Sequence, residues 1–364
     1  MKNNPRVVFC FKKKNIFSFE KNGPGEFKYG LDYIQKSLPV SSLFSGRYHL
    51  AYLFFRALEK IITKKALCGI YFQFYLNNKK KIKKNDLLFA INDGVSLGLL
   101  FFKLLRKFDN EITVIIQGLH DRYKYFKNNK LLVNFYKRLL GRAEMILTLS
   151  KYERGLLVKS FELEPQKVKV FYFGTDINYW SKTRVGAKDK AGDFVLTVGS
   201  DMHRDYNLLL NHYRLKMPLK FVTRILTKRQ LNKVEESDCF ETDKNISNEK
   251  LRNLYFQSRF VVVPLKNTLA TSGLSTVLQA LAMEKPVLLA KTPAIQELFE
   301  DYKHVLYYEE KNPTSFKEKL DELNGDKRLR ERLAKNGRKL VEEKFNSENM
   351  GKQVLRMMKS FVNF

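Results

Sequence analysis

Short apolar runs alternate along the chain with longer segments in which apolar residues recur every three or four positions. The short runs have the length and β-branched content of strands buried in a parallel sheet, and they lie at 6–11, 112–116, 143–150, 167–173, 219–223, 259–265, 287–290 and 304–308. The longer segments predict helices at 250–258, 272–286, 327–345 and 348–364. We therefore expect an α/β protein.

The clearest such unit runs from Arg259 to Glu300. Its first strand ends at Leu265, and a loop follows. A helix then begins near Ser272 or Gly273 and buries an apolar stripe formed by Leu274, Val277, Leu278, Leu281 and Ala282. Pro286 ends this helix, and the next strand follows at once.

The first turn of this helix is rich in small polar residues, namely Ser272, Gly273, Ser275 and Thr276. A helix N-terminus presents unpaired N–H groups and the positive end of the dipole, and small residues let a diphosphate approach them. Gln279, one to two turns on, could direct its amide at a ribose. The alternative is that serine and threonine only cap the helix, which is their usual role there.

Two other strand ends carry candidate chemistry. After residue 193 a strand, Gly199, a polar loop and a helix follow one another, as in a phosphate-facing turn. The strand at 112–116 leads into His120 and Asp121, and polar residues at the carboxyl edge of a parallel strand project into the crevice that binds ligands. Either residue could act as a base or position an acceptor hydroxyl. An exposed histidine without a function is the alternative.

The charge of the chain is unusual. Its 364 residues have a formal net charge of +29, with the basic excess concentrated in the first half. Such a field attracts nucleic acid, anionic lipid or a phosphorylated acceptor, although solvated lysine-rich faces have the same composition. The tract Asn77–Asp86, preceded by an aromatic and leucine-rich segment at 48–75, could dock on an anionic membrane or form an exposed loop. The sequence shows no signature of a specific nucleic-acid-binding module.

Cysteine usage and hydropathy indicate the compartment. Cys10, Cys68 and Cys239 are scattered in no ligand spacing, which argues against a structural metal and for a reducing compartment. No apolar run has the length of a membrane span, and the apolar core at the start is too short for a signal peptide. We expect a cytoplasmic protein, either free or peripheral on the inner face of the membrane.

The central stretch resembles the nucleotide-sugar glycosyltransferases of the GT-B fold, and among them the group 1 enzymes. The residues that carry this resemblance are Ser272, Gly273, Thr276, Gln279, Ala280, Ala282, Lys285, Pro286, Val287 and Glu297. The family has a glutamate on the helix, and many retaining members have a second one eight residues earlier, where this chain has Gln279 and Thr271. Glutamine can still hydrogen-bond a hydroxyl, whereas threonine cannot act as a carboxylate.

The resemblance implies roles for particular residues. Arg204 matches the cation that pairs with the donor diphosphate, although an ordinary ion pair with Asp201 or Asp205 is the alternative. The turn from Ser272 to Thr276 would hold that diphosphate, and Gln279 would bind the ribose. His120, or Gln117 in another register, would lie at the reaction centre, with Gly23 and Gly25 as weaker candidates on a loop facing the cleft. Enzymes of this fold generally need no metal, and the nucleotide-diphosphate sugar is a substrate rather than a cofactor.

The implied fold is α/β of the GT-B type, with two Rossmann-like domains facing a central cleft. We expect a first domain at 1–180, a linker at 181–193, a nucleotide-sugar domain at 194–345 and a terminal helix at 346–364 that packs back on the first domain. The implied activity is that of a hexosyltransferase in polysaccharide or glycoconjugate synthesis, with a glycan or lipid-linked acceptor. The alternatives are a degenerate GT-B nucleotide or glycan-binding protein, a GT-B epimerase and an electrostatic nucleic-acid binder.

Overall fold

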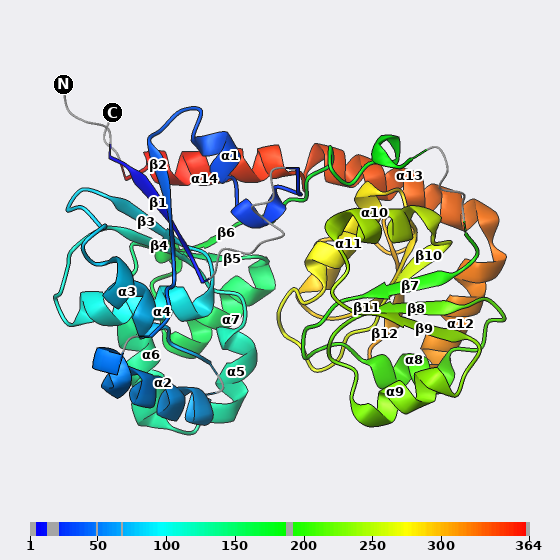
Figure 1. Ribbon diagram of the computed structural model, residues 1–364, viewed down its shortest axis with the longest axis horizontal. Coiled ribbons are helices and arrows are strands. Elements are labelled where there is room, and N and C mark those ends of the chain that lie inside the picture. Colours follow the sequence, from blue (N-terminus) through cyan, green and yellow to red (C-terminus); the bar gives the residue numbers. More distant parts are fainter. Residues whose placement is uncertain (1–4, 13–21, 49, 67, 187–191, 362–364) are drawn as a thin grey trace. The chain divides into compact units, whose positions relative to one another are not determined.

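The structure is a computed structural model that describes residues 5–12, 22–48, 50–66, 68–186 and 192–361. In it the chain divides into two compact units. Among the described residues, the first unit takes 5–12, 28–172 and 350–361, and the second takes 22–27 and 173–349 (Figure 1).

The first unit is built on one six-stranded sheet in the order β2-β1-β3-β4-β5-β6, with every pair parallel. Its strands are β1 (Val7–Phe11), β2 (Val40–Phe44), β3 (Leu87–Ala90), β4 (Ile112–Ile115), β5 (Met145–Thr148) and β6 (Val168–Val170). The strands β1, β3 and β4 are buried along their whole length, as expected of a sheet covered on both faces. The chain order reverses between β1 and β3.

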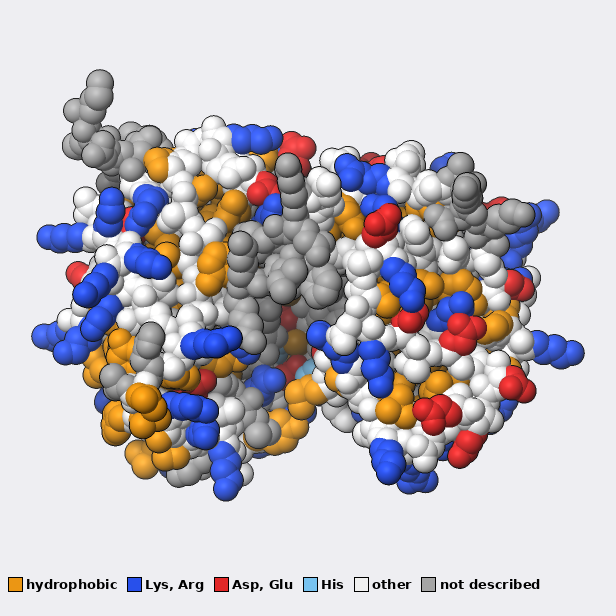
Figure 2. Space-filling model, viewed as in Figure 1, with side chains coloured by type: hydrophobic (Ala, Val, Ile, Leu, Met, Phe, Trp, Pro, Cys, Tyr) orange, Lys and Arg blue, Asp and Glu red, His pale blue; other side chains and the backbone are white. Residues whose placement is uncertain are grey.

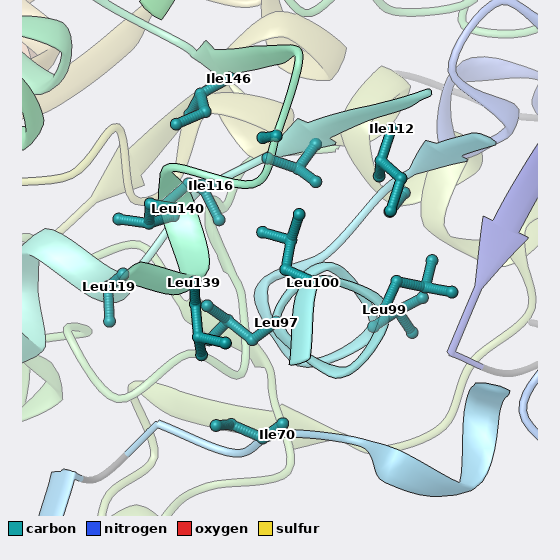
Figure 3. Close-up of a cluster of buried hydrophobic side chains, with 14 of the residues drawn as sticks. Ile70, Leu97, Leu99, Leu100, Ile112, Ile116, Leu119, Leu139, Leu140 and Ile146 are labelled. Carbon is teal, nitrogen blue, oxygen red and sulfur yellow. The ribbon is translucent and has the colours of Figure 1, made fainter. Parts of the chain in front are cut away.

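Helices cover this sheet and supply the rest of the core. They are α1 (Leu31–Ile34), η3 (Leu50–Tyr52), α2 (Leu53–Ala66), α3 (Phe72–Asn78), α4 (Asp93–Leu104), α5 (Leu119–Phe126), α6 (Lys130–Leu140), α7 (Lys151–Phe161), η4 (Pro165–Lys167) and α14 (Ser347–Lys359). Figure 3 shows Leu97 and Leu100 of α4 between Ile112 of β4 and Leu139 of α6, all fully buried. Cys10 and Cys68 belong to the same core.

The last helix, α14, packs on the first unit. A Cβ added to Gly351 would lie 2.4 Å from Cβ of Tyr33, so the helix can approach this closely only because residue 351 has no side chain. The amide of Gln353 both donates to the carbonyl of Tyr172 at 3.2 Å and accepts from its N–H at 3.0 Å. The C-terminal helix is therefore part of the first unit.

The second unit also has a six-stranded parallel sheet, in the order β12-β11-β10-β7-β8-β9. Its strands are β7 (Val195–Val198), β8 (Leu219–Val222), β9 (Phe240–Asp243), β10 (Phe260–Val263), β11 (Val287–Lys291) and β12 (Leu306–Glu309). Counted from β7, this is the Rossmann strand order 3-2-1-4-5-6, and its switch point lies between β7 and β10.

The helices of the second unit are η5 (Lys182–Arg184), α8 (Tyr206–His212), α9 (Lys228–Glu235), α10 (Asn248–Gln257), α11 (Leu274–Ala282), η6 (Ile295–Glu297), α12 (Pro313–Gly325) and α13 (Lys327–Glu343). A further turn, η2 (Glu26–Lys28), begins in this unit and ends in the first. Across the residues that the structure describes, no helix combines the length and apolar character that a membrane crossing requires.

The division of the chain differs from the one expected at residue 180. Residues 173–180 pack with the second unit, where Trp180 is fully buried, and so do residues 22–27. The N–H of Gly25 donates to the carboxylate of Asp176 at 3.0 Å, and the rings of Phe27 and Phe173 pack together. In the expected linker 181–193, residues 187–191 lie outside the described residues, while 182–184 form η5.

Candidate functional site

The loops that follow β7 and β10 are joined at the carboxyl edge of the second sheet. The N–H of Asp205 donates to the carbonyl of Pro264 at 3.1 Å, and the N–H of Lys266 donates to the carbonyl of His203 at 2.8 Å. Arg204 and Leu265 thereby form an isolated antiparallel bridge. Because the chain order reverses between β7 and β10, this edge is where an open α/β sheet binds a ligand.

Arg204 lies at the centre of this edge, and its side chain is only 2% exposed. Nη2 donates to the hydroxyl of Thr276 at 3.1 Å. Nε lies 2.8 Å from a carboxylate oxygen of Asp201, outside hydrogen-bond geometry, so this contact is an ion pair. Nη1 has no hydrogen-bond partner among the described residues. We call Arg204 with Gly199, Asp201, Gly273 and Thr276 the Arg204 cluster.

Two glycines make room for this guanidinium. A Cβ on Gly199 would lie 2.3 Å from Nε of Arg204, and a Cβ on Gly273 would lie 3.1 Å from Nη1. Both glycines also have positive φ, +143° and +79°, which other residues rarely adopt. Any side chain at position 199 would therefore displace the arginine.

Helix α11 begins beside Nη1 of Arg204. Its N-cap residue is Gly273, which has no side chain with which to cap the first turn. Capping by serine or threonine, the alternative to anion binding, is therefore not what the structure shows. The hydroxyl of Ser272 instead pairs with that of Thr268 at 3.0 Å, and Ser275 is half-buried in the first turn. The first turn thus combines a helix dipole with a buried cation.

Gln279 follows Thr276 by three residues, so both lie on one face of α11. Its amide nitrogen donates to Oε1 of Glu26 at 3.0 Å, and its carbonyl oxygen accepts from the hydroxyl of Tyr255 at 3.3 Å. The indole N–H of Trp180 donates to the same Glu26 oxygen at 2.7 Å. We call Glu26, Trp180, Tyr255 and Gln279 the Glu26 cluster.

Glu26 is fully buried in the second unit. Burial raises the pKa of Glu26 to about 6, against the opposing effect of the hydrogen bonds from Gln279 and Trp180. Its second oxygen accepts from the N–H of Asp176 at 3.3 Å. At position 279 the family has a glutamate and this chain has a glutamine. Glu26 therefore places a carboxylate next to that position, although it comes from another part of the chain.

His120 and Asp121 lie in the first unit, in the first turn of α5, and both are buried. Nε2 of His120 lies 3.7 Å from Oε1 of Glu153, which is also fully buried. Asp93, in the first turn of α4, accepts from the N–H of Gln117 at 2.7 Å and of Gly118 at 2.9 Å. Burial raises the pKa of Asp93. His120 is thus an interior residue beside a carboxylate rather than an exposed histidine.

The structure brings Gly199, Arg204, Gly273 and Thr276 together, with Gln279 one turn further along α11. Sequence reasoning missed Glu26 and Asp93. Glu26 directly follows the Gly23–Gly25 loop, but its partners lie 154 and 253 residues away. Asp93 follows strand β3, which is not among the predicted strands because only a short polar stretch separates its apolar residues from those of the helix after it.

Comparison with known families supports the resemblance. Residues 227–340 match the family model described as "Glycosyl transferases group 1". The matched region contains α11 and Gln279, but it begins after Gly199 and Arg204. The similarity to group 1 glycosyltransferases is therefore confirmed for this part of the chain. A search of curated proteins found no match.

Solved structures extend the likeness to nearly the whole chain. HepE from Anabaena, in complex with UDP and glucose, superimposes with a TM-score of 0.71 at 11% identity, covering 98% of this chain and 100% of its own. Sucrose-phosphate synthase from Thermosynechococcus elongatus gives 0.72 at 14% identity, with 98% and 99% covered. A mutant of TarM from S. aureus, in complex with UDP, gives 0.60 at 15% identity, with 78% and 57% covered. At these identities the likeness shows the fold, which is α/β of the GT-B type.

Proposed function

We propose that this chain, which matches the group 1 glycosyltransferases over residues 227–340 and has the GT-B fold, transfers a hexose from a nucleotide-diphosphate sugar to a glycan or lipid-linked acceptor. The observation that carries the proposal is the buried guanidinium of Arg204. Its Nη1 has no hydrogen-bond partner in the part of the chain that the structure describes, and it lies beside the start of α11, where Gly273 offers no side-chain cap. A buried cation next to a helix N-terminus favours an anion such as a diphosphate.

The chemistry of the proposal is electrostatic. Negative charge grows on the leaving diphosphate as the bond to the sugar breaks, and preorganised donors stabilise that charge. Arg204 and the first-turn N–H groups of α11 are such donors. His120 is the proposed base for the acceptor hydroxyl, because the nearby Glu153 carboxylate would stabilise the imidazolium that forms when it takes the proton. Asp121 is the alternative base.

The test is a thermal-shift panel of UDP, GDP, ADP, CMP and their sugars, starting with UDP and UDP-glucose because HepE structures hold them. We expect at least one nucleotide sugar to raise the melting point, since a ligand at a hundred times Kd adds about 2.7 kcal/mol. Arg204→Ala should abolish this shift because the diphosphate loses its buried cation.

The matched control is Arg332→Ala, which removes the same charge from an exposed position on α13. If Arg204→Ala lowers the melting point of the free protein too far, Arg204→Lys keeps the charge but not the planar fork, and it should weaken binding. A variant that folds and still binds the donor like wild type would contradict the phosphate assignment. Donor binding without transfer to any acceptor would favour a binding protein, and release of free nucleotide without an acceptor would favour an epimerase.

The proposal also includes contact between the first unit, which would bind the acceptor, and an anionic membrane. Helix α2 and the turn before it leave apolar side chains in water: Leu50 is 83% exposed, Phe54 72%, Leu53 55% and Ile61 55%. Phe54 and Ile61 are seven residues apart and emerge on one side of the helix. Exposed basic residues accompany them at Arg56, Lys60 and Lys64. Figure 2 shows orange and blue side chains gathered over α2.

The neighbouring corner between α5 and α6 has the same character. Tyr125 is 55% exposed and Leu131 85%, and they border a hollow of about 570 Å³ that Lys124 and Lys130 also line. The sequence from 122 to 140 contains no Asp or Glu. We call the exposed residues of α2 and of this corner the α2 surface. Apolar side chains among lysines suit the headgroup region of an anionic bilayer.

A further inference from the structure

The side-chain amide of Gln279 is held by hydrogen bonds to two other side chains, Glu26 and Tyr255. Its nitrogen is 3.0 Å from Glu26 and its oxygen is 3.3 Å from Tyr255. Gln279 itself is 7% exposed and Glu26 is fully buried. The position of this amide is therefore set by a residue that lies 253 positions earlier in the sequence.

The hydrogen-bonding capacity of the amide can be counted. Glutamine has two N–H donors and two acceptor lone pairs. Glu26 takes one donor and Tyr255 takes one acceptor site, so one donor and one acceptor site remain that no described side chain takes. An ionised carboxylate can only accept hydrogen bonds, so the Gln279 amide must turn its nitrogen, and not its oxygen, toward Glu26. Such a fixed donor and acceptor pair matches two adjacent hydroxyls of a sugar ring.

The contact also gives a physical reason for glutamine at position 279. A glutamate there would place a second carboxylate about 3 Å from that of Glu26, and two carboxylates at that distance cannot both ionise readily. With glutamine at position 279, the Glu26–Gln279 pair carries at most one negative charge, on Glu26. Glu26 supplies the charge, and Gln279 supplies the neutral hydrogen-bonding group.

We propose that Glu26 is a positioning residue for the nucleoside end of the donor, holding Gln279 ready to bind the ribose hydroxyls. This inference rests on the proposed function, which places the diphosphate at the Arg204 cluster. Thr276 contacts Arg204 and lies three residues before Gln279. A ligand with its diphosphate at the start of α11 therefore has its next group within reach of Gln279.

A reciprocal exchange tests the pair. Four proteins are compared: wild type, Glu26→Gln, Gln279→Glu and the double exchange Glu26→Gln/Gln279→Glu. Glu26→Gln should raise the nucleotide Kd and the donor KM about tenfold, with little change in kcat, because the amide loses its fixed orientation. Gln279→Glu should weaken binding at pH 8 and recover part of it at pH 5.5, where one carboxylate of the pair is protonated. The double exchange restores one carboxylate and one amide and should bind within about threefold of wild type.

The matched control is Glu235→Gln, at an exposed position on α9, which should bind like wild type. If wild type binds no nucleotide sugar, the proposed function fails and this inference fails with it. If wild type binds but folded Glu26→Gln has the same KM, only the inference is overturned. If Glu26→Gln does not fold, the double exchange decides: weak binding by the folded double variant contradicts the pairing, and recovered binding supports it.

Discussion

The carboxyl group of Glu26 couples folding to pH. Burial raises its pKa from the ordinary 4.5 to about 6, so the folded chain holds this proton more tightly than the unfolded chain does. The stabilising contribution is present below pH 4.5 and is lost as pH rises through 6, a change of about 2 kcal/mol. Asp176 and Tyr255 are titratable groups beside Glu26, and a substitution at 26 leaves both in place.

We therefore expect the free energy of unfolding of wild type, measured relative to Glu26→Gln, to fall by about 2 kcal/mol between pH 4 and pH 7. Urea titrations of both proteins at several pH values measure this difference. The raised pKa of Asp93 acts on both proteins alike and cancels in the comparison. Parallel stability profiles for the two proteins would contradict a buried carboxylate at this position.

At the same scale, the sequence could predict some site residues and not others. Gly199 and Gly273 stand at the ends of recognisable patterns, a strand before a polar loop and the start of an amphipathic helix, and both lie against Arg204. Glu26 has no such local pattern, because its role comes from Trp180 and Gln279, which lie far along the chain. The carboxylate beside His120 likewise comes from another helix, where Glu153 lies 33 positions later in the sequence.

At the scale of helices and strands, segments with a strong apolar pattern were predicted correctly, whereas segments with a weak pattern were missed. The pattern at 259–265 became β10, and the pattern at 250–258 became α10 (Asn248–Gln257). Strand β2 escaped detection because it is half-buried and contains Ser41 and Ser42 rather than a continuous apolar run. Strand β3 merged with α4 because only a short polar stretch separates their apolar residues.

Two helical glycines allow a prediction at this scale. Gly155 in α7 is exposed, and a Cβ there would meet nothing within 4 Å, whereas a Cβ on Gly351 in α14 would lie 2.4 Å from Cβ of Tyr33. Gly155→Ala should stabilise the protein by about 0.5–1 kcal/mol because alanine loses less backbone entropy. Gly351→Ala should destabilise it by about 1–3 kcal/mol through overpacking.

Urea unfolding of the two variants beside wild type measures both signs. Since the same chemical change is made in two helices, helix propensity alone would stabilise both. A stabilised Gly351→Ala protein would show that α14 does not pack closely on the helix that carries Tyr33.

The net charge of +29 is a property of the whole molecule. On the α2 surface, exposed basic side chains lie beside exposed apolar ones. We expect co-sedimentation with phosphatidylglycerol-containing vesicles but not with pure phosphatidylcholine vesicles. Each basic residue near such a surface contributes about 1 kcal/mol, so binding should fall as salt rises. Phe54→Ser/Ile61→Ser should reduce binding at least tenfold, because two apolar side chains no longer enter the headgroup region.

The control is Lys228→Ser/Arg229→Ser, which removes two exposed charges from α9 in the second unit. An equal loss of binding in this control would assign the attraction to net charge alone. Binding that survives the loss of Phe54 and Ile61 would remove α2 from the contact.

The two-unit plan was expected from the order of strands and helices, but its boundaries could not be read from composition. Residues 22–27 and 173–180 join the second unit because Glu26, Asp176 and Trp180 are bonded to one another. In the sequence these two stretches are separated by strands β2 to β6 of the first sheet, and no local sequence signal marks the contacts between them.

This interleaving bears on how the protein is made. The ribosome delivers the chain from its N-terminus, yet Tyr33 is covered only when Gly351 of α14 arrives. The carboxylate of Glu26 likewise receives its hydrogen bond from Gln279 only after Gln279 has been synthesised. Part of the first unit must therefore stay uncovered during synthesis until α14 has left the exit tunnel.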